Sequence, residues 1–142
     1  MNPDSVCSVG ARMAGLAEAI AWVESFCRAC GVSGDDSLRL SLVVEELFTN
    51  TVTHGYGGES DAPVRIALRA DAAEIELSFE DEAPPFDPLA HVARSAAAVE
   101  AAGADRPVGR LGIALVVGMA VRIDYARDGG CNRLRVALRR GG

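Results

Sequence analysis

The stretch EELFTNTVTHGYG, Glu45–Gly57, carries three polar residues at helical spacing. Glu46, Asn50 and His54 follow one another at i, i+4 steps, which places their side chains on one face of a helix. A helix at the surface of a globular domain usually buries one apolar stripe and exposes the opposite side. The pattern by itself therefore suits an ordinary solvated helix face, and its meaning depends on the residues that the rest of the chain brings to it.

Composition and charge restrict the class of protein. The chain has 142 residues, which suits a single domain spanning residues 1–142. Its net charge is −6 and all 14 basic residues are arginines with no basic run, which argues against binding to nucleic acid or to a membrane surface. No apolar run reaches the length of a membrane span, and the N-terminus lacks the basic-then-apolar pattern of a signal peptide. We expect a cytoplasmic protein.

Two of the four cysteines form a CxxC motif. Cys27 and Cys30 close an amphipathic helical pattern, whereas a redox CxxC opens a helix after a strand. No second cysteine pair completes a zinc site, and both histidines are distant in the sequence. We interpret the cysteines as small structural residues of the interior.

Hydrophobic periodicity predicts the fold. Helices are expected at about residues 11–30 and 36–54 and from Gly112 onwards, and strands at 63–70, 73–81, 119–127 and 131–140. This order is typical of an α+β two-layer sandwich, with a mixed, mainly antiparallel sheet and the helices on one face. On the first two of these strands, arginines and glutamates occupy the faces opposite the apolar residues, so pairing between them would help to fix the register.

The segment from residue 84 to residue 110 separates the two halves of this pattern. It is rich in alanine, which favours a helix but offers little to bury, so we expect a marginal helix within a mobile connection. A connection of this length in a compact domain is usually either functional or disordered.

Two further polar features follow the Glu46/Asn50 face. Asp81 ends a strand before two prolines that cannot continue the ladder, and a carboxylate held there could accept a hydrogen bond from an exocyclic amine such as that of adenine. Gly109 and Gly112 precede an apolar helix, whose free N–H groups could bind phosphate. Each feature alone is weak evidence. In this order they match an ATP site, in which Asn50 suits Mg²⁺ and Glu46 suits proton acceptance.

On these motifs the chain resembles the GHKL (Bergerat-fold) ATP-binding domain over nearly its whole length. It looks most like the bacterial anti-sigma-factor serine-protein kinases, also called switch-protein kinases. The matching segments are EELFTNTVTHGYG for the N box, DEAPPFDP and GRLGIALV for the two glycine boxes, and GGCNRL for the final hairpin. The resemblance implies an ATP lid at about residues 84–110. The small size disfavours the histidine kinase, gyrase-like, chaperone and mismatch-repair branches of the superfamily.

The resemblance assigns roles to individual residues. It implies that Glu46 is the general base, that Asn50 is the Mg²⁺ ligand and that Asp81 accepts the adenine amine. It also implies that the lid and the following helix close on the phosphates, and that a polar residue of the final hairpin lies near adenine. The positions implied to contact the nucleotide are Asn50, Asp81, Ala83, Phe86, Gly109, Arg110, Leu111, Gly112 and Asn132. His54 is implied to be structural or peripheral.

Three features depart from the family pattern. Ala83 stands where the first glycine box has a glycine, which adds a methyl group near the base and disfavours a positive φ. Arg110 follows Gly109 where a second glycine is usual, and an arginine there could stiffen the lid or bind a phosphate. The usual first edge strand is either reduced to residues 4–9 or missing.

We therefore expect a serine-protein kinase that binds Mg·ATP and phosphorylates a small anti-sigma factor antagonist of the STAS kind, regulating transcription by partner switching. A sigma factor or another regulatory protein is a possible second target, and the resemblance suggests a homodimer. Two alternatives remain open: a non-catalytic binding module of the same fold, and an ATP hydrolase in which Glu46 activates water.

Overall fold

The computed structural model of the chain describes residues 5–90 and 111–141. Within these ranges the elements are, in chain order, β1 (Ser5–Ala11), α1 (Met13–Ala29), α2 (Gly34–Asn50), the π-helical turn η1 (Thr51–Gly55), β2 (Ser60–Ala70), β3 (Glu74–Asp81), α4 (Leu111–Met119), β4 (Arg122–Asp128) and β5 (Cys131–Arg139). The strands and helices predicted within these ranges are present, with ends that differ by a few residues.

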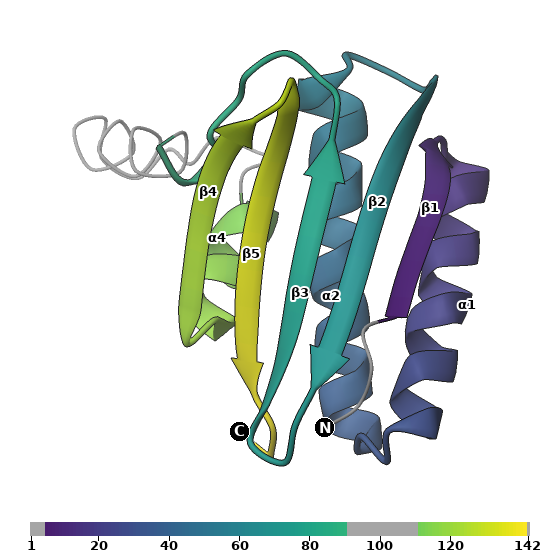
Figure 1. Ribbon diagram of the computed structural model, residues 1–142, viewed down its shortest axis with the longest axis vertical. Helices are drawn as coiled ribbons and strands as arrows, with labels where there is room; N and C mark the ends of the chain where they lie inside the picture. The colour runs from purple at the N-terminus through teal and green to yellow at the C-terminus, as the bar shows by residue number, and fades with distance from the viewer. Residues whose placement is uncertain (1–4, 91–110, 142) are drawn as a thin grey trace.

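The strands form one sheet in the order β1-β2-β3-β5-β4, and each of its four described pairings is antiparallel. The helices lie together on one side of this sheet, behind it in the view of Figure 1. The predicted α+β two-layer sandwich is thus confirmed, and within the described ranges its sheet is purely antiparallel.

The helix-facing side of the sheet forms the core. In β2 and β3 every second residue is buried against the helices, as the alternating pattern predicts. These residues are Val64, Ile66, Leu68, Ile75, Leu77 and Phe79. Helix α2 covers them, and the ring of its Phe48 meets the ring of Phe79 edge to face at a centroid distance of 6.4 Å.

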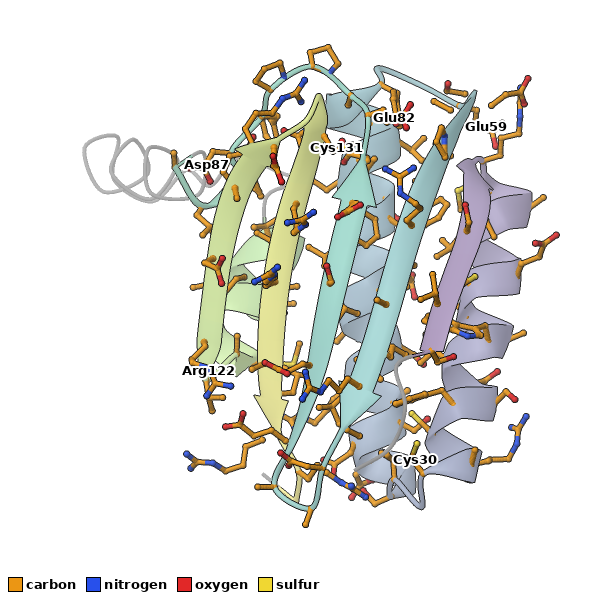
Figure 2. The ribbon with its side chains drawn as sticks, viewed as in Figure 1. Cys30, Glu59, Glu82, Asp87, Arg122 and Cys131 are labelled. Carbon is orange, nitrogen blue, oxygen red and sulfur yellow. The ribbon has the colours of Figure 1, made fainter. Side chains whose placement is uncertain are left out.

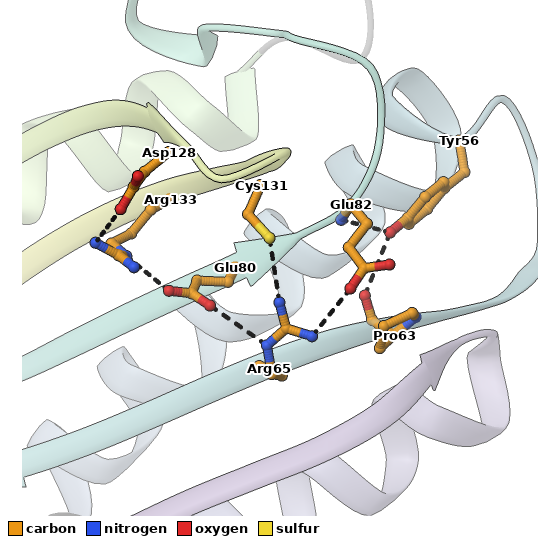
Figure 3. A network of polar contacts seen from close by, with 8 residues as sticks. All are labelled: Tyr56, Pro63, Arg65, Glu80, Glu82, Asp128, Cys131 and Arg133. Atoms are coloured by element: carbon orange, nitrogen blue, oxygen red, sulfur yellow. Dashed lines mark hydrogen bonds and ion pairs between the residues drawn. The ribbon is translucent and has the colours of Figure 1, made fainter.

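The opposite side of the sheet is charged (Figure 3). Glu80 of β3 lies between Arg65 of β2 and Arg133 of β5, and it accepts hydrogen bonds from Arg65 Nε at 3.3 Å and from Arg133 Nε at 2.6 Å. Burial alone would raise the pKa of Glu80, but the two arginines outweigh it and hold that pKa below its ordinary value. The predicted arginine–glutamate pairing is confirmed, and it favours this register over a shifted one.

Two boundaries differ from the sequence prediction. The first edge strand is present, because Ser5–Ala11 pairs with β2, and α1 consequently begins at Met13 and not near residue 11. The second helix ends as a regular α-helix at Asn50 and continues as the π turn η1 to Gly55. Such π turns often occur at functional sites.

The predictions for the cysteines, for membrane-spanning helices and for the alanine-rich segment can be compared directly with the structure. All four cysteines are free. Cys27 is buried in the core as predicted, whereas Cys30, the other residue of the CxxC motif, is only half-buried. In the described ranges, no helix has the length and apolarity needed to cross a bilayer. The alanine-rich helix expected between residues 84 and 110 falls on residues 91–110, a range that includes Gly109 and Arg110 and lies outside the described residues.

Gly15→Ala is expected to destabilise the fold. Alanine normally favours a helix interior by about 1 kcal/mol over glycine. Here α1 crosses β1 so closely that a Cβ at Gly15 would overlap the carbonyl oxygen of Gly10. Relieving that overlap requires a backbone shift, so we expect the free energy of unfolding to fall by about 1–3 kcal/mol in urea denaturation.

Gly118→Ala is the matched control, because a Cβ at Gly118 of α4 meets no atom within 4 Å. Its stability should stay unchanged or rise. Equal effects of the two substitutions would contradict the close packing of α1 on β1.

Candidate functional site

One end of the sheet, where η1, the end of β3 and the start of β5 meet, brings together four of the predicted site residues: Asn50, Asp81, Phe86 and Asn132. Figure 2 marks this end by Glu82, Asp87 and Cys131, whereas Arg122 lies at the opposite end of the sheet. A cavity of about 30 Å³ opens here. Its walls are formed by Leu47, Asn50, Thr51, Gly55, Phe79, Asp81, Phe86, Pro88, Tyr125, Asn132 and Leu134.

Asp81 is a buried carboxylate at the bottom of this cavity, with 7% of its surface exposed. Oδ2 accepts a hydrogen bond from Thr51 Oγ1 at 3.0 Å, and Oδ1 accepts from Asn132 Nδ2 at 2.8 Å and from the Ala83 N–H at 3.1 Å. A carboxylate offers about four acceptor positions. One position, on Oδ2, therefore remains for a donor that enters the cavity.

Asn132 lies directly opposite Asp81 in the β3–β5 register and is also buried. Its Nδ2 donates to Asp81 and to the carbonyl oxygens of Ala83 and Pro84, while Oδ1 accepts from the Phe86 N–H and the Tyr125 hydroxyl. Both halves of the amide are fully used. In this arrangement Asn132 holds the segment after β3 in place and has no capacity left for a base, so a direct contact with adenine stays a prediction.

Ala83 fits the site without backbone strain. It is fully buried, and among the described residues only glycines have positive φ. Its methyl group lies where a Cβ on Gly55 would approach to 3.2 Å, so the glycine of η1 leaves room for the alanine after β3. The conformational objection to Ala83 therefore does not apply to this structure.

Tyr56, directly after η1, holds the chain that follows Asp81 at the end of β3 (Figure 3). Its hydroxyl donates to the Pro63 carbonyl at 3.2 Å and accepts from the Glu82 N–H at 2.7 Å. Burial raises the pKa of Tyr56 above its ordinary value, which keeps the hydroxyl protonated and able to donate.

Glu46 and Gly112 meet where α2 and α4 are in contact. A Cβ at Gly112 would overlap the Glu46 carboxylate, so this carboxylate lies directly against the first turn of α4. Glu46 and Asn50 are both half-buried, and within the described residues neither side chain has a hydrogen-bond partner. Leu111 begins α4. His54 is exposed on η1.

The residues present fit a nucleotide in their chemistry. The cavity combines apolar walls with one free carboxylate position, and Asn50 adds a neutral oxygen of the kind that Mg²⁺ accepts beside water and phosphate oxygens. The volume of about 30 Å³ holds only a water molecule or two. A purine base is larger than this space, so the fit to a nucleotide lies in the chemistry of the lining and not in the size of the cavity.

Some contributors to the site are absent from the sequence prediction. Thr51, Tyr56, Tyr125 and Arg127 hold Asp81 or the segment after it, the last through Nη1 to the Ala83 carbonyl at 2.7 Å. The sequence offered a signal only for Tyr56 and Thr51, which stand inside the N box. Tyr125 and Arg127 belong to a strand pattern that gives no indication of distant partners.

The model of the histidine kinase-like ATPase domain family matches residues 9–138. The chain belongs to this family. Membership implies ATP binding, and it confirms the GHKL superfamily expected from the three boxes. A search of curated proteins gives no significant sequence match.

This histidine kinase-like ATPase domain shares its fold with two solved structures. One is the crystal structure of the RsbU and RsbW domains of Rv1364c from Mycobacterium tuberculosis, at 14% identity and a TM-score of 0.66, covering 99% of this chain and 34% of that one. The other is the SiaB–SiaC complex from Pseudomonas aeruginosa, at 12% identity and a TM-score of 0.54, covering 95% of this chain and 89% of that one. The chain thus spans about a third of the mycobacterial protein.

Asn132→Ala is expected to lower the free energy of unfolding by about 2–4 kcal/mol. It removes the donor to three buried or half-buried oxygens and leaves the Asp81 carboxylate less satisfied. Asn50→Ala is the matched control, because this side chain has no hydrogen bond within the described residues and alanine suits a helix end. Chemical denaturation of both variants measures the difference, and a similar loss in each would refute the holding role of Asn132.

Proposed function

We propose that this ATPase domain is a serine-protein kinase of the anti-sigma type. It binds Mg·ATP and phosphorylates a serine of a small antagonist protein of the STAS kind, and so regulates transcription by partner switching. The observation that carries the proposal is the order of contacts along one helix. Glu46 lies against the first turn of α4, Asn50 follows one turn later at the cavity wall, and Thr51 bonds to Asp81.

These positions correspond to the parts of a nucleotide site. Asp81 accepts from the base, Asn50 binds the metal, and the first turn of α4 with Gly112 faces the phosphates, where a helix N-terminus favours negative charge. Asn132, Tyr56 and Ala83 keep the base end rigid. Phosphoryl transfer depends mainly on such positioning and on charge neutralisation.

Glu46 is the proposed general base. The serine oxygen forms the new bond to the γ-phosphorus, the bond to the leaving ADP oxygen breaks, and the hydroxyl proton passes to the Glu46 carboxylate. Mg·ATP supplies the phosphoryl group and the charge neutralisation. Because Glu46 is half-buried beside α4, its carboxylate is partly withdrawn from water while a hydroxyl can still reach it.

The partner is proposed from the resemblance and from the proteins that the two matched structures contain. One is a complex of two proteins, SiaB and SiaC, and the other contains an RsbW domain joined to an RsbU domain. Both are consistent with a protein acceptor. A sigma factor as a second target, a homodimer and a cytoplasmic location rest on the sequence alone and stay proposals.

A second candidate is a non-catalytic binding module of the same fold. The small cavity of about 30 Å³ favours it, because a module that only exchanges protein partners has no need of space for a base. The two candidates differ in whether the chain gains stability from ATP and whether it transfers phosphate.

Glu46→Gln should abolish phosphotransfer while leaving ATP binding intact. The amide cannot take the serine proton, so we expect a loss of about 10²–10⁴-fold in the rate of phosphoserine formation on an antagonist encoded beside the kinase, measured by intact mass. Glu45→Gln is the matched control, because Glu45 is the exposed neighbour on the same helix. Full activity of Glu46→Gln, or an equal loss in the control, would count against the mechanism.

Mg·ATP should raise the melting temperature of the wild-type chain, because a ligand that binds only the folded state stabilises it. Asp81→Asn should remove most of this increase, since an amide NH₂ turned to the cavity would face the adenine amine. Asp124→Asn, on the open face of the sheet, should retain it. No increase in the wild type would favour the non-catalytic module.

A further inference from the structure

Tyr125 of β4 has a hydroxyl with one hydrogen-bond partner in the described part of the chain. This partner is Asn132 Oδ1, at 2.5 Å. The ring packs half-buried against the core, where a phenylalanine would fill the same space. The hydroxyl thus adds nothing to packing, and its contact is with the residue that holds Asp81.

We propose that Tyr125 is a specificity-determining positioning residue for the nucleotide base. By fixing Asn132 it keeps Asp81 in one orientation, with a single acceptor position turned to the cavity, so that the site selects a base with an exocyclic amine. This inference rests on the proposed binding of ATP and adds a residue that acts through others.

The first step is the fixation of Asn132. Its Oδ1 has two acceptor positions, and the Tyr125 hydroxyl and the Phe86 N–H occupy both. Without the hydroxyl, Oδ1 keeps only the 3.2 Å bond from Phe86 and gains an unused acceptor position beside the cavity. The amide could then tilt towards any donor that enters, and its bonds to Asp81 and to the segment after β3 would lengthen.

The second step is the orientation of Asp81. Oδ1 is fully used by Asn132 Nδ2 and the Ala83 N–H, and Thr51 takes one position on Oδ2. The remaining acceptor position is a lone pair of Oδ2. A lone pair at the cavity attracts an amine of the base and repels a carbonyl oxygen. A fixed carboxylate therefore separates adenine from hypoxanthine, which carries a carbonyl in place of the amine. A carboxylate free to turn could instead accept from the ring N–H of hypoxanthine.

The third step is the fixation of the segment after β3, which forms the cavity wall opposite α2. Side chains of the β4–β5 hairpin bind backbone groups of this segment. Arg127 and Asn132 both donate to the Ala83 carbonyl, and Asn132 also bonds to the Pro84 carbonyl and the Phe86 N–H. Specificity requires that a polar site be held to within a fraction of an ångström. Asn132 makes most of these contacts, and the Tyr125 hydroxyl fixes Asn132 through its hydrogen bond to Oδ1.

The test compares the affinities of ATP and inosine triphosphate for the full chain, with Mg²⁺, by calorimetry. The wild type should prefer ATP by about 100-fold or more, because a buried acceptor left unpaired or opposed by a carbonyl is costly. Tyr125→Phe should lower the affinity for ATP about three- to tenfold and leave the affinity for inosine triphosphate nearly unchanged. The preference for ATP then falls by the same factor. Ser78→Ala, which removes a hydroxyl from the other face of the sheet, should leave the preference as it is.

A double-mutant cycle shows whether Tyr125 acts through Asn132. In an Asn132→Ala background, Tyr125→Phe should cause no further change in the preference, since the intermediary is gone. Additive losses would overturn the inference. If Tyr125→Phe does not fold, Tyr125→Leu, which also lacks the hydroxyl, carries the same expectation for the preference.

The outcomes separate this inference from the proposed function. Binding of neither nucleotide by the wild type would overturn both. ATP binding by the wild type with an unchanged preference in Tyr125→Phe would overturn the role of Tyr125 alone. Equal weakening of both nucleotides would do the same, because a purely structural residue affects them alike.

Discussion

The carboxylate of Asp81 is a buried charge that depends on three separate parts of the chain. Thr51 comes from η1, the Ala83 N–H from the turn after β3, and Asn132 from β5. A buried carboxylate without such donors is strongly unfavourable, so the donors and the carboxylate must come together for the fold to form. The end of the molecule that carries the candidate site is therefore also one of its structural constraints.

Helix α2 and the turn that continues it give the site its order. The apolar face of α2 packs on the sheet, and this packing fixes which side Glu46 and Asn50 present. The π turn then rotates the chain so that Thr51 points at the end of β3, and Tyr56 ties the next turn to Pro63 and Glu82. One continuous helical segment thus contacts α4 at one end and the Asp81 carboxylate at the other.

Much of the fold could be predicted because its signals are local. Alternation in β2 and β3 gave the buried Val64 and Phe79 correctly, and helical spacing gave the inward side of α2. The order of the motifs selects Glu46, Asn50 and Asp81 as candidate site residues, and the structure places Asn50 and Asp81 at one cavity. The edge strand was left open, since residues 5–11 are short and become a strand only by pairing with β2.

The roles of Ala83, Asn132 and Tyr125 could not be predicted, because each depends on partners far away in the chain. Ala83 is compatible with the site because Gly55 leaves it space, and Asn132 is saturated by Tyr125 and by the backbone after β3. Local spacing in the sequence is enough to specify the secondary structure, the family motifs and the candidate site residues, since it indicates which face of an element a side chain occupies. The hydrogen bonds that hold these residues depend on the folded chain, because bonds across strands join residues that no local pattern relates.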